Sequence, residues 1–484
     1  MPTSQYLPDD RRNGLPRREF LTRATMLAAA ASLGCSGDIS NTLAPLSRNQ
    51  DNVGGQQGGD DPLPAGDKSG IEHIILIMME NRSFDHFLGW APHADGRQAG
   101  LSYPDRNGVL QPTFALAPDF QGCSFADPDH SFDGARVQFD NGQCDGWLRT
   151  GGFDKFPIGY YRRDDLKFFG RAVPDWTIAD RYFSAILGPT FPNRIFQSAA
   201  QTDRISNTAN PSVLPTIWDL LLARGLTARN YFHDLPTTAL WGQKYASIWR
   251  PVSSFFSDCA AGTLPQVSLI DPLFGGEAAG TSNDDHPFAD IRAGEDLLNR
   301  IYAAVTKSPA WANTVLVVNY DEWGGFYDHV PPPRGSVSDS DRAAGYTDGL
   351  RGFRTPLLVV SPFARRGIVG HRVYDHTSIL NMIEWRWNLP SLTMRDRTAN
   401  NLAQLLQFTK PDLQATQYLV PSVTGATCPV PSPFIAGSQP DFGKSSSFDG
   451  GSALAIAGPR AATREAWRAV ARANGLPMGL ANAL

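Results

Sequence analysis

Short runs of β-branched and aliphatic residues alternate with amphipathic segments along most of the chain. The hydrophobic runs are typical of strands buried on both faces of a parallel sheet, and the amphipathic segments have the spacing of helices that cover such a sheet. The predicted strands are residues 71–79, 227–232, 266–270, 314–319 and 355–360. The predicted helices are residues 84–88, 172–181, 216–224, 291–306, 377–387 and 462–474, and another is expected to begin near residues 195–201. We therefore predict an α/β fold with a central, mostly parallel sheet and helices on both faces.

Polar residues follow four of these strands. They are Glu80 and Asn81, His233 and Asp234, Asp271, and Asp321 and Glu322. Because the carboxyl ends of parallel strands meet at one edge of a sheet, where ligands bind in open α/β folds, these residues are expected to lie together. The alternative is that polar residues simply begin loops, which explains one such ending more easily than the whole series.

Asp321 and Glu322 indicate a metal site. Two adjacent carboxylates after a buried strand repel each other unless a cation or a proton lies between them. Glu80 and Asn81 supply further oxygen ligands of the kind that Mg²⁺, Ca²⁺ and Mn²⁺ prefer. We expect a divalent metal ion (Ca, Mg, Mn or Zn), and the alternative is a solvated acidic loop.

Thr190 is a second candidate for chemistry. Gly188 and Pro189 impose a sharp, rigid approach to Thr190. The helix expected to begin near residue 195 places its hydroxyl close to helix-terminal amides, which favour an anion. The preceding stretch 90–170 is rich in Gly, Pro, Asp and aromatic residues with weak periodicity, and we interpret it as a long irregular excursion over the rim of the site.

Four histidines that directly follow an aspartate are further candidates for chemistry. They are His130, His286, His329 and His376. A neighbouring carboxylate can support an imidazole that acts as an acid, a base or a ligand, although a single Asp-His pair is more often structural.

Residues 1–35 have the pattern of an export signal. Arg17 and Arg18 form a twin-arginine pair, and the Ala-rich apolar segment after them is too short to span a bilayer. We expect bacterial export through the twin-arginine machinery to the periplasm, the cell surface or the medium. Cys35 lies in a loose match to a lipoprotein cleavage site, which would add a lipid anchor. Residues 36–69 contain almost nothing apolar and are predicted to be a flexible linker.

Cys123, Cys144, Cys259 and Cys428 form an even set, which in an exported chain favours disulfides. On loop proximity alone, we expect Cys123 to pair with Cys144 and Cys259 to pair with Cys428. No Cys-x-x-Cys motif occurs, so a thiolate zinc site is not expected.

The composition is that of a globular protein, with 42% hydrophobic and 19% charged residues. The net charge of −5 argues against a nucleic-acid partner. We predict a catalytic domain over residues 70–430 and a C-terminal tether with a helix over residues 431–484.

Four motifs occur in an order that resembles a known family. They are Glu80 to His86, Gly188 to Arg194, Asn283 to Pro287 and Tyr320 to Val330. Together they are similar to the bacterial phosphoesterase family that contains phosphatidylcholine-preferring phospholipases C and a group of acid phosphatases. The resemblance spans residues 70–410 and implies an alkaline-phosphatase-like α/β fold.

The resemblance also implies roles for the candidate residues. The metal ligands would be Glu80, Asn81, Asp321 and Glu322, together with the hydroxyl of Thr190. Thr190 would be the nucleophile that forms a phosphothreonine intermediate. The remaining catalytic candidates are His130, His286, Asp285, His329 and His376, of which Asp285 and His376 could instead complete a second metal site.

We expect an exported, metal-dependent phosphoric ester hydrolase of phospholipase C type. Its substrate would be a phospholipid or another phosphate ester, reached through peripheral membrane contact. Thr190, where Ser is the alternative in the family, resembles the phospholipase branch. The other interpretations are an acid phosphatase on the same scaffold and a non-catalytic surface-binding protein.

Overall fold

The computed structural model describes residues 62–152, 154–428 and 459–475. The predicted export signal at residues 1–35 lies outside this part of the chain, as does most of the predicted linker. Among the described residues, none of the helices has the length and apolar character needed to cross a membrane.

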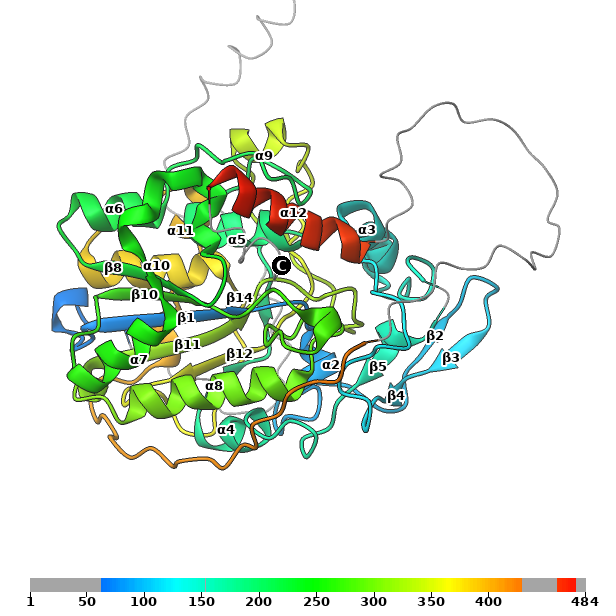
Figure 1. The fold of residues 1–484 in the computed structure, drawn as a ribbon, viewed down its shortest axis with the longest axis horizontal. Coiled ribbons are helices and arrows are strands. Elements are labelled where there is room, and N and C mark those ends of the chain that lie inside the picture. Colours follow the sequence, from blue (N-terminus) through cyan, green and yellow to red (C-terminus); the bar gives the residue numbers. More distant parts are fainter. Residues whose placement is uncertain (1–61, 153, 429–458, 476–484) are drawn as a thin grey trace, which may run out of the picture. The chain divides into compact units, whose positions relative to one another are not determined.

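An eight-stranded sheet lies at the centre of the catalytic region (Figure 1). Its strand order is β13-β6-β12-β11-β1-β10-β8-β9. The bounds are β1 (His73–Met79), β6 (Thr177–Ala179), β8 (Ala228–Phe232), β9 (Trp249–Pro251), β10 (Val267–Asp271), β11 (Thr314–Tyr320), β12 (Leu357–Val360) and β13 (Val369–Gly370). Strands β11, β1, β10, β8 and β9 run parallel, whereas β12 is antiparallel to both of its neighbours. The predicted mostly parallel sheet is confirmed.

Helices cover both faces of this sheet, with α6, α10 and α11 on one side and α4 and α8 on the other in Figure 1. The helices are α2 (Phe84–Leu88), α3 (Phe132–Phe139), α4 (Phe169–Asp175), α5 (Thr190–Ala199), α6 (Ile217–Ala223), α7 (Val252–Ala261), α8 (Ile291–Thr306), α9 (Asp339–Ala343), α10 (His376–Trp387), α11 (Met394–Arg397) and α12 (Pro459–Ala473). The 3₁₀ helices are η1 (Gly66–Lys68), η2 (Asp140–Gly142), η3 (Phe156–Ile158), η4 (Thr237–Ile248), η5 (Glu277–Ala279), η6 (Trp311–Asn313) and η7 (Leu402–Leu405). The smaller strand pairs are β2 (Ser102–Pro104) with β3 (Leu110–Pro112), β4 (Phe114–Ala115) with β5 (Gly159–Tyr160), and β7 (Tyr182–Phe183) with β14 (Tyr374–Asp375).

The predicted bounds of strands and helices agree best with the structure where the hydrophobic pattern is long. Every residue of β11 is buried, and β1 is buried from Ile74 onward, as expected for the middle of a parallel sheet. Helix α8 has its predicted bounds. Helix α2 begins after Ser83, whose hydroxyl accepts the amide of His86 as the expected N-cap.

The helix predicted at 172–181 is wrong in its second half. Helix α4 ends at Asp175, and β6 follows it at once and pairs with β12 and β13. Pairing within the sheet outweighs the local amphipathic pattern here. The stretch 90–170 is also more ordered than predicted, because it contains α3 and four short strands.

Helix α5 begins at Thr190 rather than near residue 195. Pro192 lies in its first turn, where a missing amide proton breaks no helical hydrogen bond. The Asn193 side chain donates to the Gly188 carbonyl at 2.8 Å and so fixes the approach to the helix. The structure therefore places Thr190 at the first helical position.

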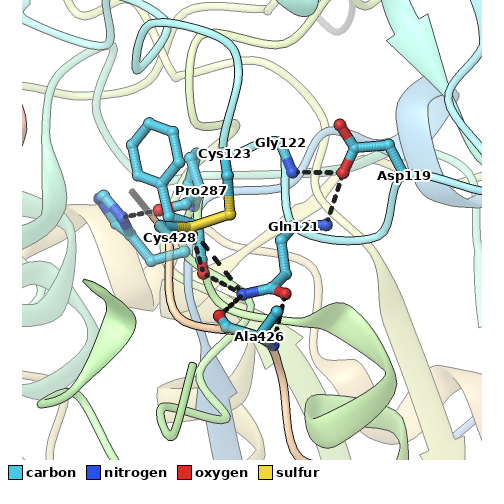
Figure 2. The surroundings of a disulfide bond; sticks show 9 residues. Asp119, Gln121, Gly122, Cys123, Pro287, Ala426 and Cys428 are labelled. Atoms are coloured by element: carbon cyan, nitrogen blue, oxygen red, sulfur yellow. Dashed lines mark hydrogen bonds between the residues drawn. A yellow bond between two sulfur atoms is a disulfide. The ribbon is translucent and has the colours of Figure 1, made fainter. Parts of the chain in front are cut away.

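The disulfide joins Cys123 to Cys428, with a Cα–Cα distance of 5.2 Å (Figure 2). The predicted pairs were wrong, and Cys144 and Cys259 are buried free thiols. Gln121 exchanges two hydrogen bonds of 2.8 Å with the backbone two residues before Cys428. These contacts bind the end of the catalytic region to the loop that precedes α3.

Candidate active site

The carboxyl ends of β1 and β11 are joined to each other. The amide of Asn81 donates to Asp321 Oδ1 at 3.1 Å, and the amide of Asp321 donates to the carbonyl of Met79 at 3.1 Å. Asn81 has a φ of 61°, a costly conformation for a residue other than glycine and one that is frequent at functional sites. A Cβ atom on Gly324 would lie 2.2 Å from the Asn81 carbonyl oxygen, so only glycine fits there. The two strand ends thus hold Asn81 and Asp321 side by side, as the sequence pattern predicts.

Arg194 connects the strand-end carboxylates. Its buried guanidinium lies 3.2 Å from Glu80, 3.3 Å from Asp321 and 4.0 Å from Asp271. Arg194 is one turn beyond Thr190 in α5, so the two residues lie on the same face of the helix. Sequence reasoning gave Arg194 no role, although its spacing from Thr190 was a signal that could have found it.

His233 and Asp234 support a neighbouring turn. The Asp234 carboxylate accepts the amides of Phe274 at 3.3 Å and Gly275 at 2.8 Å. His233 Nδ1 lies 3.0 Å from the Asp271 carbonyl. These contacts fix the position of the Phe274 ring beside Arg194, 5.0 Å from its guanidinium carbon.

Four buried oxygen atoms at this edge have no hydrogen-bond partner within the described part of the chain. They are Asn81 Oδ1, Thr190 Oγ1, Glu322 Oε1 and Asp321 Oδ2, the last of which has an ion pair with Arg194. Burying polar atoms without partners costs free energy. Carboxylate, amide and hydroxyl oxygens are the ligands that hard divalent cations take, so this donor set fits a divalent metal ion.

The carboxylates of the site carry more negative charge than Arg194 can offset. Burial raises the pKa of Glu322 well above its usual range, and the charge of Asp321 raises it further. Burial also raises the pKa of Glu80 well above its usual range, although the charge of Arg194 opposes this shift. A cation held among these side chains would favour their ionised forms.

His130 borders the same cluster, and its side chain is buried. Its Nδ1 lies 2.8 Å from the Pro128 carbonyl, so Nδ1 carries the proton in the neutral ring. Its Nε2 then accepts from the Asn81 amide nitrogen, 3.4 Å away. That contact assigns the Asn81 side-chain nitrogen to His130 and leaves Asn81 Oδ1 for a cation.

His286 presents a free acceptor. Its Nδ1 lies 3.2 Å from the Pro287 carbonyl and 3.4 Å from the Glu277 carboxylate, so Nδ1 carries the proton. Its buried Nε2 has no hydrogen-bond partner among the described residues. Burial lowers the pKa of His286 to about 4, so the ring is neutral near neutral pH. Its ring centre lies 5.8 Å from that of His130, and the two rings with Asp127 form a group close enough to hold a metal ion.

Asp284 is a further candidate residue of the active site, and the sequence analysis did not single it out. Its carbonyl accepts the amide of Glu80 at 2.8 Å, and its Oδ1 accepts the amide of His286 at 3.1 Å. Burial raises its pKa well above the usual range, and the charges of Glu80 and Glu277 raise it further. The motif contains two adjacent aspartates, and the sequence does not show which of them faces the site.

Asp285 and His376 have other partners. The Asp285 carboxylate accepts the Tyr320 hydroxyl at 2.6 Å, and burial raises its pKa to about 7. His376 lies between the Tyr182 hydroxyl and the Asp321 carbonyl, at 2.8 Å from each. His376 therefore supports the backbone of a metal-ligand candidate, and the predicted catalytic and second-metal roles of both residues stay predictions.

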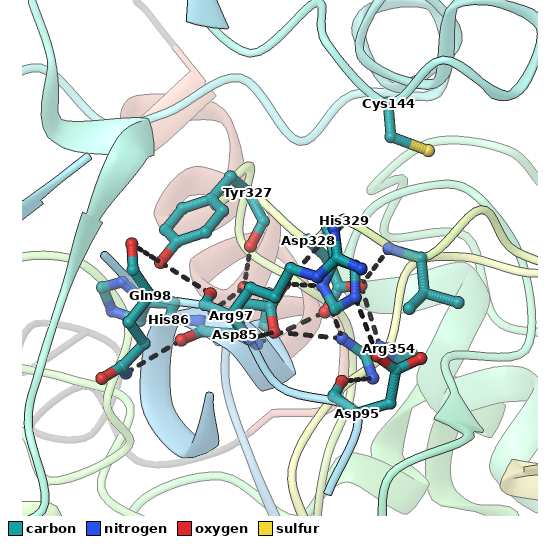
Figure 3. Close-up of polar contacts among 12 residues, drawn as sticks. Asp85, His86, Asp95, Arg97, Gln98, Cys144, Tyr327, Asp328, His329 and Arg354 are labelled. Carbon is teal, nitrogen blue, oxygen red and sulfur yellow. Dashed lines mark hydrogen bonds and ion pairs between the residues drawn. The ribbon is translucent and has the colours of Figure 1, made fainter. Parts of the chain in front are cut away.

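His329 belongs to a separate ionic network, shown in Figure 3. Its Nδ1 lies 2.5 Å from Asp85 and its Nε2 lies 3.1 Å from Asp95. Arg354 pairs with Asp85 at 3.1 Å and with Asp328 at 2.9 Å. Burial alone would lower the pKa of His329, but the hydrogen bonds to the two aspartates raise it to about 9. Both ring nitrogens are engaged in ion pairs, and the predicted catalytic role of His329 stays a prediction.

Comparison with known proteins places the chain in a family. Residues 71–390 match the model of the Phosphoesterase family. The non-specific phospholipase C6 of Arabidopsis thaliana is 30% identical over 371 residues, covering 69% of this chain and 71% of that protein. The phospholipase C A of Mycobacterium tuberculosis is 27% identical over 492 residues, covering 86% of this chain and 90% of that protein.

A crystal structure of an alkaline phosphatase superfamily protein from Vibrio parahaemolyticus is 10% identical, with a TM-score of 0.33, over 69% of this chain and 70% of that chain. That similarity is too weak to carry an argument. The family match is different, because it covers well over half of the chain and contains every site residue described above. The chain therefore belongs to the phosphoesterase family and is a phosphoric ester hydrolase.

Proposed function

We propose that this enzyme is an exported, metal-dependent phospholipase C that cleaves a phospholipid on the glycerol side of its phosphate. The observation that carries the proposal is the group of unpartnered oxygens at the ends of β1 and β11 and at the first residue of α5. The two relatives named above are phospholipases C, which supports the choice of substrate class.

The residues that would hold the metal are Glu80, Asn81, Asp321 and Glu322, with Thr190 as a further ligand. When bound, a divalent ion supplies Lewis acidity, which makes a hydroxyl more acidic and screens the charge of phosphate. Arg194 holds two of these carboxylates in place and adds a fixed positive charge. The first-turn amides of α5 favour a phosphate at the same position.

Thr190 Oγ1 would attack phosphorus in line with the leaving diacylglycerol oxygen. The bond to diacylglycerol breaks as the bond to Thr190 forms, which gives a phosphothreonine intermediate. The Nε2 of His286 would accept the Thr190 proton. The leaving diacylglycerol oxygen lies on the opposite side of phosphorus and would take its proton from another histidine or from water. In the second half, water attacks phosphorus from that side and gives up a proton, the bond to Thr190 breaks, His286 returns its proton to the threonine oxygen, and phosphocholine is released. His130 would border the phosphate beside Asn81.

The test is a direct comparison of two substrates with the purified protein. We expect release of diacylglycerol and phosphocholine from phosphatidylcholine, and loss of that release with a chelator. Thr190→Ala should lower kcat by about a thousandfold or more, whereas Thr190→Ser, which keeps a hydroxyl, should retain much of it. Turnover of p-nitrophenyl phosphate alone would identify a phosphomonoesterase instead. If neither substrate is turned over and the chelator has no effect, the proposal is wrong.

Export is a separate part of this proposal. The disulfide between Cys123 and Cys428 supports it, because such bonds persist in oxidising compartments. Replacing Arg17 and Arg18 with lysine should keep the protein in the cytoplasm of a bacterial host. Labelling with a fatty acid that depends on Cys35 would show lipid anchoring, and export of the double-lysine variant at the normal level would contradict the twin-arginine route.

A further inference from the structure

Helix α12 lies outside the family match and packs against the helix that carries the nucleophile. Its Trp467 is 2% exposed and lies between two aromatic rings. The ring of Phe191 is 4.4 Å away, and the ring of Phe274 is stacked at 5.0 Å. Phe191 directly follows Thr190, and the Phe274 ring also contacts the Arg194 guanidinium. Trp467 therefore covers Phe191, which is next to Thr190 in the chain, and Phe274, which contacts Arg194.

Two hydrogen bonds join the end of α12 to η4. At its C-terminal end the Asn474 side chain donates to the Ala239 carbonyl at 3.2 Å, and the Gln243 side chain donates to the Asn474 carbonyl. In the sequence, residues 429–458 lie between Cys428 and α12. Among the described residues, the aromatic stack, the buried Val470 and Ala471 and these two hydrogen bonds with η4 hold the helix in place.

The candidate active site is closed in this structure. The side chains of Asn81, Thr190 and Glu322 are fully buried, and those of His130 and His286 are nearly so. A phospholipid phosphate must reach Thr190 Oγ1, so a covering element has to move before catalysis. The apolar residues of α12 belong to the same hydrophobic cluster as the strands and α5, but α12 is not part of the sheet and can leave without breaking it.

The two faces of α12 differ in chemistry. Trp467, Val470 and Ala471 are buried against the enzyme, whereas the Arg468 and Arg472 side chains are 36% and 53% exposed. The helix sequence contains four arginines and one glutamate. A basic helix with a tryptophan on its apolar face is typical of segments that lie in the interface of a lipid surface.

We propose that α12 is a cap that a phospholipid surface displaces from the active site. The apolar face that covers Phe191 and Phe274 transfers to the lipid, the arginines meet the phosphate groups, and Thr190 becomes accessible. Because Trp467 is removed from water in both states, its burial in lipid offsets the loss of its contacts with Phe191 and Phe274, and the presence of lipid shifts the balance. This inference rests on the proposed phospholipase function and adds its regulation.

The experiment measures the rate on a short-chain phosphatidylcholine below and above its critical micelle concentration. For the full chain, we expect the rate to rise by about tenfold or more when micelles form, because micelles increase the population of the open state. Trp467→Ala should raise the rate on monomeric lipid by a similar factor and should remove most of the rise. Trp387→Ala, in the partly buried last turn of α10, is the matched control, and its rates below and above the critical micelle concentration should equal those of the wild-type protein.

Hydrogen exchange on the intact chain gives a readout that does not depend on activity or on a variant. Micelles should increase exchange of the backbone amides that α12 covers at the turn around Phe274, and they should leave those of α10 unchanged. An unchanged or lower rate of folded Trp467→Ala on monomeric lipid, or unchanged protection of that turn in micelles, would overturn the proposal that α12 is a cap. If the enzyme hydrolyses only p-nitrophenyl phosphate, the phospholipase assignment fails, and the exchange experiment still decides whether lipid displaces α12.

Discussion

His329 should make the stability of the enzyme depend on pH. Its hydrogen bonds to Asp85 and Asp95 raise its pKa to about 9 in the folded protein, against about 6.5 in an unfolded chain. A group whose pKa is higher in the folded state contributes stability that is fully present below the unfolded pKa and is lost as the pH rises through the folded pKa. The free energy of unfolding should therefore fall between about pH 6.5 and pH 9 through this residue.

The magnitude follows from the two pKa values. A difference of this size corresponds to roughly 3 kcal/mol, because one pKa unit is worth about 1.4 kcal/mol. The Asp95 side chain is 39% exposed, so solvent screens its half of the interaction. Asp85 is fully buried, so solvent does not screen its interaction with His329, although Asp85 also pairs with Arg354. We therefore expect His329 to contribute about 2 kcal/mol of pH-dependent stability.

The assay compares the wild-type protein with His329→Gln, which keeps a hydrogen-bonding side chain and cannot be charged. Urea unfolding followed by tryptophan fluorescence would give the free energy of unfolding at about pH 6 and about pH 9.5. The stability difference between the two proteins should shrink by about 2 kcal/mol at the higher pH. His93→Gln, at an exposed histidine, is the control. A difference between wild type and His329→Gln that is equal at both pH values would refute the reasoning.

Three further predictions concern the site and the covalent link. Arg194→Lys should lower kcat by about tenfold or more, because a lysine cannot contact two carboxylates as a planar guanidinium does, and a wild-type rate in steady-state kinetics would contradict this. Replacing Cys123 and Cys428 with serine should lower the free energy of unfolding by about 2–4 kcal/mol, and reductant should have no effect on the unfolding of that variant. Removing divalent metal should lower the Tm, and restoring it at about a hundred times its Kd should return nearly 3 kcal/mol. A scan in which none of Mg²⁺, Ca²⁺, Mn²⁺ or Zn²⁺ moves the Tm would count against the metal site.

Much of the fold and part of the site could be predicted from the sequence. Long hydrophobic runs such as β1 and β11 are buried on both faces, and that requirement is visible in the residues themselves. Because these strands are parallel, the polar residues that follow them meet at one edge, which places Asn81 beside Asp321. The role of Thr190 came from the order of four motifs and stays a prediction.

The sequence alone therefore determined the class of sheet, the edge on which polar groups gather and the family. Only the tertiary structure decided that Cys123 meets Cys428, that Arg194 lies among the carboxylates, and that Trp467 packs on α5. Each of these is a contact between segments far apart in the chain. A local pattern indicates whether a residue is buried. Which residue it contacts depends on how the packed elements are arranged, and no short stretch of sequence contains that information.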